Sequence, residues 1–436
     1  MVNGFKEVSE SYTLAEAIKE AQRCLKCKSA GCTKGCPISN DMAAWIGELA
    51  KGNMGNAIAI IHSRSNLPAV CGRVCAHERQ CEGHCVFAKK GDPIHIGKLE
   101  RFVADFDSEA GLAHEDIPEK TRGRVAVIGS GPAGLTVAGD LSRRGFAVEI
   151  YEMEADAGGI LMYGIPEYRL PKDVVRHETR KIESLGVKFH LNTIIGPDFT
   201  VDKLFAEGYD AIFMGTGVGV PMSLNIPGIN HPGVRQGIRF LRRVSLCERG
   251  LIGRDEVKVM PGDIVYVIGC GNTAMDAARS AIRMDAAEVT VVYHRTINEM
   301  SALRAEYEEA VEEGVKFLWE SSITAIEGGD GPSLTGVTIR TGGEERRVAA
   351  NKVLLAVGSL PASRIVSSTS GIEVDERGFV LVRDFPYGMT SRRGVFAGGD
   401  VTNRPASVVH AMADAKQVAE GIANYIDAMR LMKAIE

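Results

Sequence analysis

Eight of the ten cysteines lie between Cys24 and Cys85, and this stretch constrains the fold more than any other. They form two blocks, Cys24-x2-Cys27-x4-Cys32-x3-Cys36-Pro37 and Cys71-x3-Cys75-x5-Cys81-x3-Cys85. The first block is close to the run in which three cysteines hold one [4Fe–4S] cluster while the fourth, before proline, binds a second cluster. The thiolates therefore predict two [4Fe–4S] clusters, each with ligands from both blocks.

Two other uses of cysteine fit this pattern less well. Structural zinc usually takes a Cys-x2-Cys pair at each end of a loop, and only Cys24 and Cys27 have that spacing here. Disulfides are typical of small secreted chains, but this chain has 436 residues, and its start shows no basic segment followed by an apolar one. We therefore expect no signal peptide, reduced thiols and a cytoplasmic location.

Length and charge narrow the class of protein. A chain of 436 residues with 45% hydrophobic and 25% charged residues is expected to form two to four globular domains. The net charge of −5 gives no sign of a nucleic-acid or anionic-membrane partner. Apolar runs such as Val125–Ile128 have the length of strands, so no membrane span is predicted. Over residues 1–115 the pattern is mostly helical, with helices expected over Leu14–Cys24, Met42–Leu49 and Asn56–Asn66 and the cysteine blocks in loops between the helices.

A dinucleotide-binding fingerprint begins at Arg124. An apolar strand leads into Gly129-Ser130-Gly131-Pro132-Ala133-Gly134 and a helix, and the next strand, Ala147–Tyr151, ends at Glu152. The three glycines permit a tight turn, a close approach to a pyrophosphate and close packing of helix on strand. Glu152 can accept a hydrogen bond from a ribose hydroxyl, so this fold favours an unphosphorylated ribose.

A second fingerprint follows at Gly269-Cys270-Gly271-Asn272-Thr273-Ala274. Its second strand, Glu288–Tyr293, ends in His294 and Arg295 instead of an acid. An acid would repel a 2′-phosphate whereas an arginine accommodates it, which predicts NADP(H) at this site.

Three further strands end in glycine where backbone could pass close to a cofactor. They end at Gly215-Thr216-Gly217, at Gly358 and at Gly398-Gly399-Asp400. Asp400 stands where the ribityl chain of a flavin needs an acceptor. The helix that follows would direct its positive end toward the isoalloxazine.

The chain resembles, from near residue 12 to near residue 428, the small (β) subunits of NADPH-dependent glutamate synthase. The same module occurs in the N-terminal part of dihydropyrimidine dehydrogenase and in the flavin and iron–sulfur subunit of NADH-dependent reduced ferredoxin:NADP+ oxidoreductase. The resemblance is carried by the two cysteine blocks with Cys71-Gly-Arg-Val-Cys75, and by Gly97-Lys-Leu-Glu-Arg-Phe-Val103, Gly158-Gly-Ile-Leu-Met-Tyr-Gly-Ile-Pro166 and Gly398-Gly-Asp400.

This resemblance implies a helical double-[4Fe–4S] domain followed by two α/β dinucleotide-binding domains of the disulfide-reductase type. The implied ranges are 1–119 for the iron–sulfur domain, 120–217 and 361–436 for an FAD domain, and 218–360 for an inserted NAD(P)H domain. The first cluster would take Cys24, Cys27, Cys32 and Cys85; the second would take Cys36, Cys75, Cys81 and Glu100. Cys71 would bind neither.

The resemblance also implies the residues that contact the nucleotides. Arg169 matches a flavin-contacting arginine, but two arginines usual around the 2′-phosphate are missing, and only Arg295 and Arg304 remain. NADPH is therefore expected and NADH is possible. The predicted contacts are Gly129, Ser130, Gly131, Pro132, Ala133, Gly134, Glu152, Gly159, Leu161, Arg169, Ile195, Gly215, Thr216, Gly217, Gly269, Gly271, Asn272, Thr273, His294, Arg295, Arg304, Ala356, Gly358, Gly399, Asp400, Ser407 and Val408.

The implied function is electron transfer. Hydride transfer from nicotinamide to flavin requires mainly orientation of two rings, so we expect no catalytic side chain. NADPH would be oxidised through FAD, and single electrons would pass through both clusters to a partner. That partner is expected to be the large catalytic subunit of a glutamate synthase. The alternatives are a subunit of another electron-transfer complex, ferredoxin as acceptor, or a thioredoxin-reductase-like enzyme, which needs a Cys-x-x-Cys pair where this chain has only Cys247 and Cys270.

Overall fold

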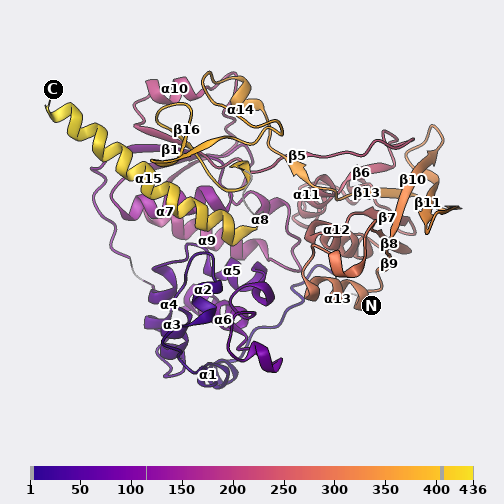
Figure 1. The fold of residues 1–436 in the computed structure, drawn as a ribbon, viewed down its shortest axis with the longest axis horizontal. Helices are drawn as coiled ribbons and strands as arrows, with labels where there is room; N and C mark the ends of the chain where they lie inside the picture. The colour runs from indigo at the N-terminus through magenta and orange to yellow at the C-terminus, as the bar shows by residue number, and fades with distance from the viewer. Residues whose placement is uncertain (1–3, 114, 403–406, 436) are drawn as a thin grey trace. The chain divides into compact units, whose positions relative to one another are not determined.

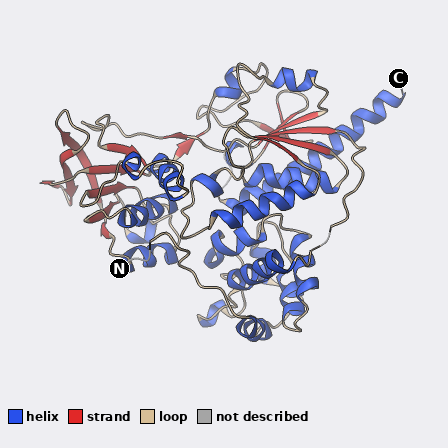
Figure 2. Ribbon diagram, turned by 180° about the vertical axis from the view of Figure 1, so that it is seen from behind, coloured by secondary structure: helices blue, strands red, loops and turns tan. Residues whose placement is uncertain are grey.

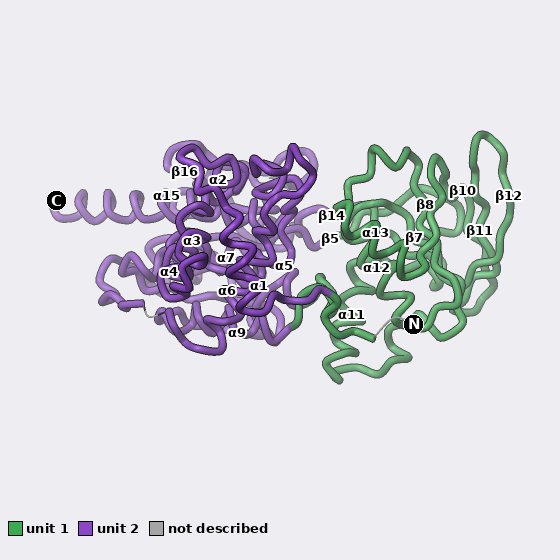
Figure 3. Tube along the Cα trace, turned by 90° about the horizontal axis from the view of Figure 1, so that it is seen from below, with its two compact units in different colours: residues 1–8, 163–171, 220–359 green, residues 9–162, 172–219, 360–436 purple. Residues whose placement is uncertain are grey.

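The structure, a computed structural model, describes residues 4–113, 115–402 and 407–435 (Figure 1). Two compact units make up the chain (Figure 3). Unit 1 contains the segment that ends at Val8, together with Tyr163–Pro171 and Val220–Ser359. Unit 2 contains Ser9–Met162, Lys172–Gly219 and the chain from Leu360 onward. None of the described helices combines the length and apolar character needed to cross a membrane.

Unit 2 begins with a group of helices around a core that includes Trp45, Leu49 and Ile61, none of which is exposed. Thr13, Asp41 and Asn53 start three of these helices by accepting hydrogen bonds from backbone N–H groups in the first turn. The elements are α1 (Leu14–Gln22), α2 (Gly31–Gly35), α3 (Met42–Leu49), α4 (Met54–His62), α5 (Pro68–Val74), η1 (His77–Arg79), η2 (Ala88–Lys90) and α6 (Ile96–Ala110).

The three helices predicted by range are present as α1, α3 and α4, whereas α2, α5 and α6 had no predicted range. The cysteine blocks were expected in loops, but Cys32 lies in α2 and Cys71 lies in α5. These helices have five and seven residues, too few to show a helical period in the sequence.

The rest of unit 2 is a doubly wound α/β fold (Figure 2). Its sheet has the order β15-β16-β17-β4-β1-β2-β3, in which β17, β4, β1, β2 and β3 are parallel. Helices α7 and α15 pack on each other, and α5 of the N-terminal group contacts both α9 and α15. The elements are β1 (Arg124–Ile128), α7 (Pro132–Arg143), β2 (Ala147–Tyr151), α8 (Ile160–Tyr163), α9 (Lys172–Ser184), β3 (Lys188–His190), α10 (Val201–Ala206), β4 (Ala211–Met214), α14 (Arg364–Ser367), β15 (Val382–Asp384), β16 (Tyr387–Thr390), β17 (Val395–Ala397), η5 (Gly399–Thr402) and α15 (Val408–Ile435).

Unit 1 is built on a second parallel sheet, of order β6-β13-β7-β8-β9, beside an antiparallel sheet of order β10-β11-β12. The short strands β5 (Val220–Pro221) and β14 (Ser359–Leu360) pair with each other. The remaining elements are β6 (Val234–Gln236), α11 (Gly237–Glu248), η3 (Arg254–Val257), β7 (Ile264–Ile268), α12 (Asn272–Arg283), β8 (Glu288–Val292), η4 (Ile297–Glu299), α13 (Arg304–Glu312), β9 (Lys316–Leu318), β10 (Ser321–Gly328), β11 (Leu334–Thr341), β12 (Glu344–Val348) and β13 (Lys352–Leu355).

Two short segments far from this sequence range also belong to unit 1. The Tyr168 ring lies under the guanidinium groups of Arg279 and Arg283, at 4.7 and 3.8 Å from the ring centroid. The backbone N–H of Val8 donates to the Tyr168 carbonyl (3.0 Å). The predicted domain ranges assign both segments to other domains, and these ranges remain predictions.

The predicted fold class is confirmed. A helical N-terminal region precedes two α/β dinucleotide-binding folds, and the second of these interrupts the first.

Candidate functional site

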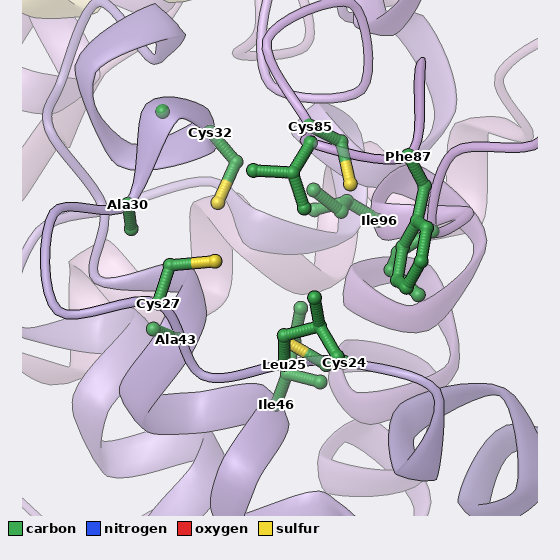
Figure 4. Close-up of a pocket in the computed structure, with 13 residues that line it drawn as sticks. Cys24, Leu25, Cys27, Ala30, Cys32, Ala43, Ile46, Cys85, Phe87 and Ile96 are labelled. Carbon is green, nitrogen blue, oxygen red and sulfur yellow. The ribbon is translucent and has the colours of Figure 1, made fainter. Parts of the chain in front are cut away.

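Four cysteines from the two blocks meet around one pocket in unit 2. The thiols of Cys24, Cys27, Cys32 and Cys85 line this pocket (Figure 4). We call these four thiols the outer thiol group, or outer group. Apolar side chains such as Ile46 and Phe87 complete the lining. Burial raises the pKa of Cys32 to about 11, and the charges at Cys24 and Cys85 act in the same direction. These are the four residues that the resemblance assigns to the first cluster.

Two glycines allow the blocks to come this close. A Cβ on Gly35 would lie 2.5 Å from the His84 ring, and a Cβ on Gly31 would collide with the His84 carbonyl. Helix α2 therefore packs directly on the turn that precedes Cys85. This contact places Cys32 beside Cys85.

A second group lies in the interior of the same unit. It consists of Cys36, Cys75, Cys81 and Glu100, which we call the inner group. Burial is the main cause that raises the pKa of Cys36 and Cys81, and a hydrogen bond with Cys71 is the main cause that raises the pKa of Cys75. The charge of Glu100 raises the pKa of all three thiols further. Burial raises the pKa of Glu100 itself to about 8, with a further contribution from the charge of Glu178. Cys81 and Glu100 are each only 4% exposed.

The crossing of helices α5 and α6 brings Cys75 and Glu100 of the inner group together. A Cβ on Gly72 would lie 2.5 Å from the backbone nitrogen of Arg101, so only glycine permits this approach. The Arg73 guanidinium donates twice to Asp105 (2.8 Å each) and holds the two helices together. Glu100, which precedes Arg101, is thereby brought to the cysteines at the end of α5. Helical period alone does not reveal this crossing.

Cys71 lies beside the inner group and contacts the flavin-type fold. It is 2% exposed, and its thiol donates to the Met412 sulfur of α15 (3.6 Å). On the same helix, the N–H of Ala69 donates to Glu178 Oε1 of α9 (2.7 Å). Glu178 Oε2 is buried without a hydrogen-bond partner among the described residues. Sequence reasoning missed Glu178 and Met412.

The donor chemistry of both groups fits iron–sulfur clusters. Buried thiols with raised pKa values bind as thiolates only where a metal supplies compensating positive charge. The four outer thiols surround a pocket instead of a common point, and within the described ranges no group of three or more His, Cys, Asp or Glu side chains is placed to hold a metal ion. The cysteines are free thiols, including Cys247 and Cys270.

The first fingerprint has the geometry of a pyrophosphate cradle. Gly129 has a positive φ of 95°, and a Cβ on Gly131 at the start of α7 would meet only open space. The Ser130 backbone and hydroxyl donate to Glu152 Oε2 (2.9 and 2.5 Å), and the hydroxyl accepts from Gly158 N–H (3.0 Å). Glu152 therefore fixes the turn, and its other oxygen accepts from Glu154 N–H (2.9 Å).

Asp400 carries an unsatisfied acceptor in the same fold. Its Oδ1 is buried and has no partner among the described residues, and burial raises the pKa of this carboxyl to about 6. Next to it, Gly399 N–H and the Tyr387 hydroxyl both donate to Asp414 (2.7 Å each). A ribityl hydroxyl would satisfy Asp400, so the residues present fit FAD. Asp414 holds this turn and was not anticipated, because a carboxylate inside a long helix has no distinguishing pattern.

The second fingerprint has its own closing loop in unit 1. Gly269 has a positive φ of 119°, and a Cβ there would collide with the Ala356 carbonyl. Asn272 Oδ1 accepts from Leu303 N–H (2.9 Å), which ties residues 301–304 to the start of α12. Arg304 pairs with Glu308 (2.8 Å), whereas His294 and Arg295 are exposed after β8.

The predicted flavin contact of Arg169 remains a prediction. In the structure its guanidinium is paired with Asp276 (2.8 Å) and Glu306 (2.7 Å), all within unit 1. Burial raises the pKa of Asp276 to about 6, against the opposing effect of Arg169.

The remaining predicted contacts follow the ends of strands and helices. Gly159 packs against Gly131, because a Cβ on Gly159 would lie only 2.9 Å from the Gly131 Cα. Leu161 and Ile195 are buried. The others are Pro132, Ala133 and Thr273 at the starts of α7 and α12, Gly134 and Gly271 in the fingerprints, Gly215, Thr216 and Gly217 after β4, Ala356 and Gly358 after β13, and Ser407 and Val408 at the start of α15.

Family comparisons agree with this arrangement. Residues 123–415 match the pyridine nucleotide-disulphide oxidoreductase family. The chain belongs to this family. Residues 1–112 of the oxidoreductase match the family described as dihydropyrimidine dehydrogenase domain II, 4Fe-4S cluster.

Relatives match the oxidoreductase over nearly its whole length. It is 35% identical to the "Glutamate synthase [NADPH] small chain" of Halomonas elongata, over 97% of this chain and 93% of the relative. It is 33% identical to the "NAD-dependent dihydropyrimidine dehydrogenase subunit PreT" of Escherichia coli K12, over 98% of each chain. It is 34% identical to the "NADP(+)-dependent formate dehydrogenase subunit beta" of Moorella thermoacetica, over 91% of this chain and 60% of the relative.

Solved structures share the fold. Thioredoxin reductase from Lactococcus lactis has a TM-score of 0.55 at 23% identity, over 70% of this chain and 99% of its own. FprA from Mycobacterium tuberculosis, in complex with NADPH, has a TM-score of 0.60 at 16% identity, over 71% and 86%.

These matches confirm the predicted cofactors and class. The oxidoreductase depends on NAD(P)H and uses FAD and [4Fe–4S] clusters.

Proposed function

We propose that this oxidoreductase is the electron-input subunit of a glutamate synthase. It would oxidise NADPH through FAD and pass single electrons through two [4Fe–4S] clusters to a large catalytic subunit in the cytoplasm. Whole-length similarity to glutamate synthase small chains supports this proposal.

When bound, the cofactors would supply the redox chemistry: the two electrons of each NADPH, released with NADP+ and one proton, would pass to FAD together and to the clusters one at a time. The protein's task is to position them. Asp400 would hold the ribityl chain, Glu152 the adenosine ribose, and the two thiol groups the clusters. This proposal requires no general acid or base.

One observation carries the proposal: within unit 2 the inner group lies against the flavin-type fold. Cys71, beside Cys75, contacts Met412 in the helix that follows Asp400. The outer group lies at the surface, where Leu25 is 63% exposed. This arrangement supports a path from the flavin-type fold through the inner group to the outer group at the surface.

Anaerobically purified protein tests this function. We expect bound FAD and iron, bleaching of the flavin band by NADPH, and two EPR signals after reduction. The Asp400→Ala variant should lose FAD and keep its iron, while Asp384→Ala, at an exposed site, should keep both. Loaded protein that neither NADPH nor NADH bleaches would overturn the proposal.

The partner requires a separate experiment. Co-expression with a glutamate synthase large subunit should give a stable complex and NADPH-driven glutamate formation. Similarity to PreT and to a formate dehydrogenase subunit supports a second candidate, namely a subunit of another electron-transfer complex. Because Arg304 already pairs with Glu308, NADH and NADPH should both be assayed. A pyrimidine-reducing or formate-oxidising partner in place of the large subunit would favour the second candidate.

A further inference from the structure

We propose that the surface around the outer thiol group docks a protein electron acceptor whose redox centre is surrounded by carboxylates. The inference rests on the proposed function and adds the chemistry of the acceptor. Five exposed lysines on the segments that carry the outer thiols, which we call the lysine rim, carry the argument; they are Lys26, Lys28, Lys34, Lys89 and Lys90.

The lysine rim lies on the same segments as the outer thiols. Lys26 and Lys28 flank Cys27, Lys34 follows Cys32 on α2, and the last two lysines end η2 just after Cys85. Positive charge is therefore concentrated within a few residues of the thiols that line the pocket.

The rim carries uncompensated charge. Residues 23–34 contain four basic residues and no acid, and residues 82–92 contain two lysines and two acids, of which Glu82 accepts a hydrogen bond from the Gly97 N–H (2.9 Å). Asp92 forms an ion pair with Arg23 (2.6 Å), and Arg23 also pairs with Glu20 (2.8 Å). No ion pair connects a rim lysine to any residue that the structure describes. The lysines are therefore available to a partner.

Apolar side chains occupy the centre of this surface. Leu25 is 63% exposed and Val86 is 47% exposed, and both line the pocket of the outer thiols. Interfaces between proteins commonly combine an apolar centre with a polar rim. A partner seated on Leu25 and Val86 would bring its redox centre next to the outer group.

Charge complementarity selects the acceptor. The chain as a whole has a net charge of −5, so the rim has the opposite sign to the rest of the molecule. An acidic protein would be repelled elsewhere and attracted here, which both orients it and accelerates encounter. A basic partner would meet repulsion at this surface.

Direct binding tests the proposal without turnover. The probe is an acidic [2Fe–2S] ferredoxin, titrated calorimetrically into the oxidised, fully loaded protein. Lys34→Glu/Lys89→Glu should raise the Kd about tenfold or more at low ionic strength, because complementary charge supplies the attraction, and the difference should shrink as salt screens it. The matched control is Arg383→Glu/Lys433→Glu, which reverses two exposed charges of the same unit away from the rim. Iron and flavin contents equal to wild type verify that each variant is folded.

Three results would overturn the docking surface: no binding of the ferredoxin by the wild-type protein, an unchanged Kd in the rim variant, or an equal loss in the control. Basic cytochrome c provides the opposite probe and should bind the rim variant more tightly than the wild-type protein. Reduction of a neutral quinone by NADPH separates the two proposals. If the quinone is not reduced, the proposed function fails, whatever the binding data show.

Discussion

The outer and inner groups use the same kind of ligand in opposite surroundings. The outer group has four half-buried thiols beside exposed Leu25 and the lysine rim. The inner group has three thiols and Glu100, and the helices around it include α9 and α15 of the flavin-type fold. Both groups join the two cysteine blocks, but only the inner group also uses a residue of α6, which Gly72 allows to cross closely over α5. It follows that changes at the α5–α6 crossing should affect the inner group selectively.

Gly72→Ala should have the largest effect. The added Cβ would meet the backbone of Arg101 and force α5 from α6, at a cost of about 1–3 kcal/mol for overpacking. We expect loss of one EPR signal and of the associated iron, with the other signal retained. Gly55→Ala, in α4, is the matched control because a Cβ there meets nothing within 4 Å. Equal loss of both signals would show that the two groups are not independent.

Glu100→Ala should remove one ligand of the inner group and leave the helix crossing intact. One EPR signal should change or disappear while the outer group's signal is unaltered, because the outer group contains no residue of α6. Glu109→Ala, on an exposed turn of the same helix, controls for the loss of a carboxylate. Two unaltered signals would refute the assignment of Glu100.

Glu178→Ala should weaken the attachment of α5 to the flavin-type fold. It leaves the buried N–H of Ala69 without an acceptor, which costs about 1–3 kcal/mol. The midpoint temperature of thermal unfolding of the loaded protein should fall. Glu178→Gln keeps an acceptor oxygen and should shift it less, so that equal shifts would exclude the hydrogen bond as the cause.

Cys71→Ser should have the smallest effect on the clusters. Both EPR signals should remain, with a stability loss of about 1 kcal/mol from a hydroxyl in a mostly apolar site. If Cys71→Ser instead removes one EPR signal and Glu100→Ala alters neither signal, then Cys71 is the cluster ligand and Glu100 is not.

The sequence predicted those features that depend on local pattern. Cysteine spacing indicated clusters with ligands from both blocks, and the outer thiols do combine Cys85 with the first block. Both fingerprints form strand, turn and helix in the predicted order because glycine positions and apolar runs specify them locally.

Features that depend on long-range packing were not visible in the sequence. Spacing alone could not choose between Cys71 and Glu100, because the α5–α6 crossing sets their positions. The packing of two arginines of α12 over the Tyr168 ring, and the use of Asp414 to hold Gly399, likewise join segments with no shared pattern. The lysine rim was also missed, because net charge conceals a local excess of the opposite sign.

The contact between Cys71 and Met412 joins residues 341 positions apart, and this has a consequence for biosynthesis. On the ribosome, every predicted cluster ligand has been synthesised once Glu100 has emerged. Helix α15, which contacts Cys71 through Met412, is synthesised after all of these residues, as a 28-residue helix at the end of the described chain. The surroundings of Cys71 are therefore complete only after the last helix has been synthesised and has folded onto α5.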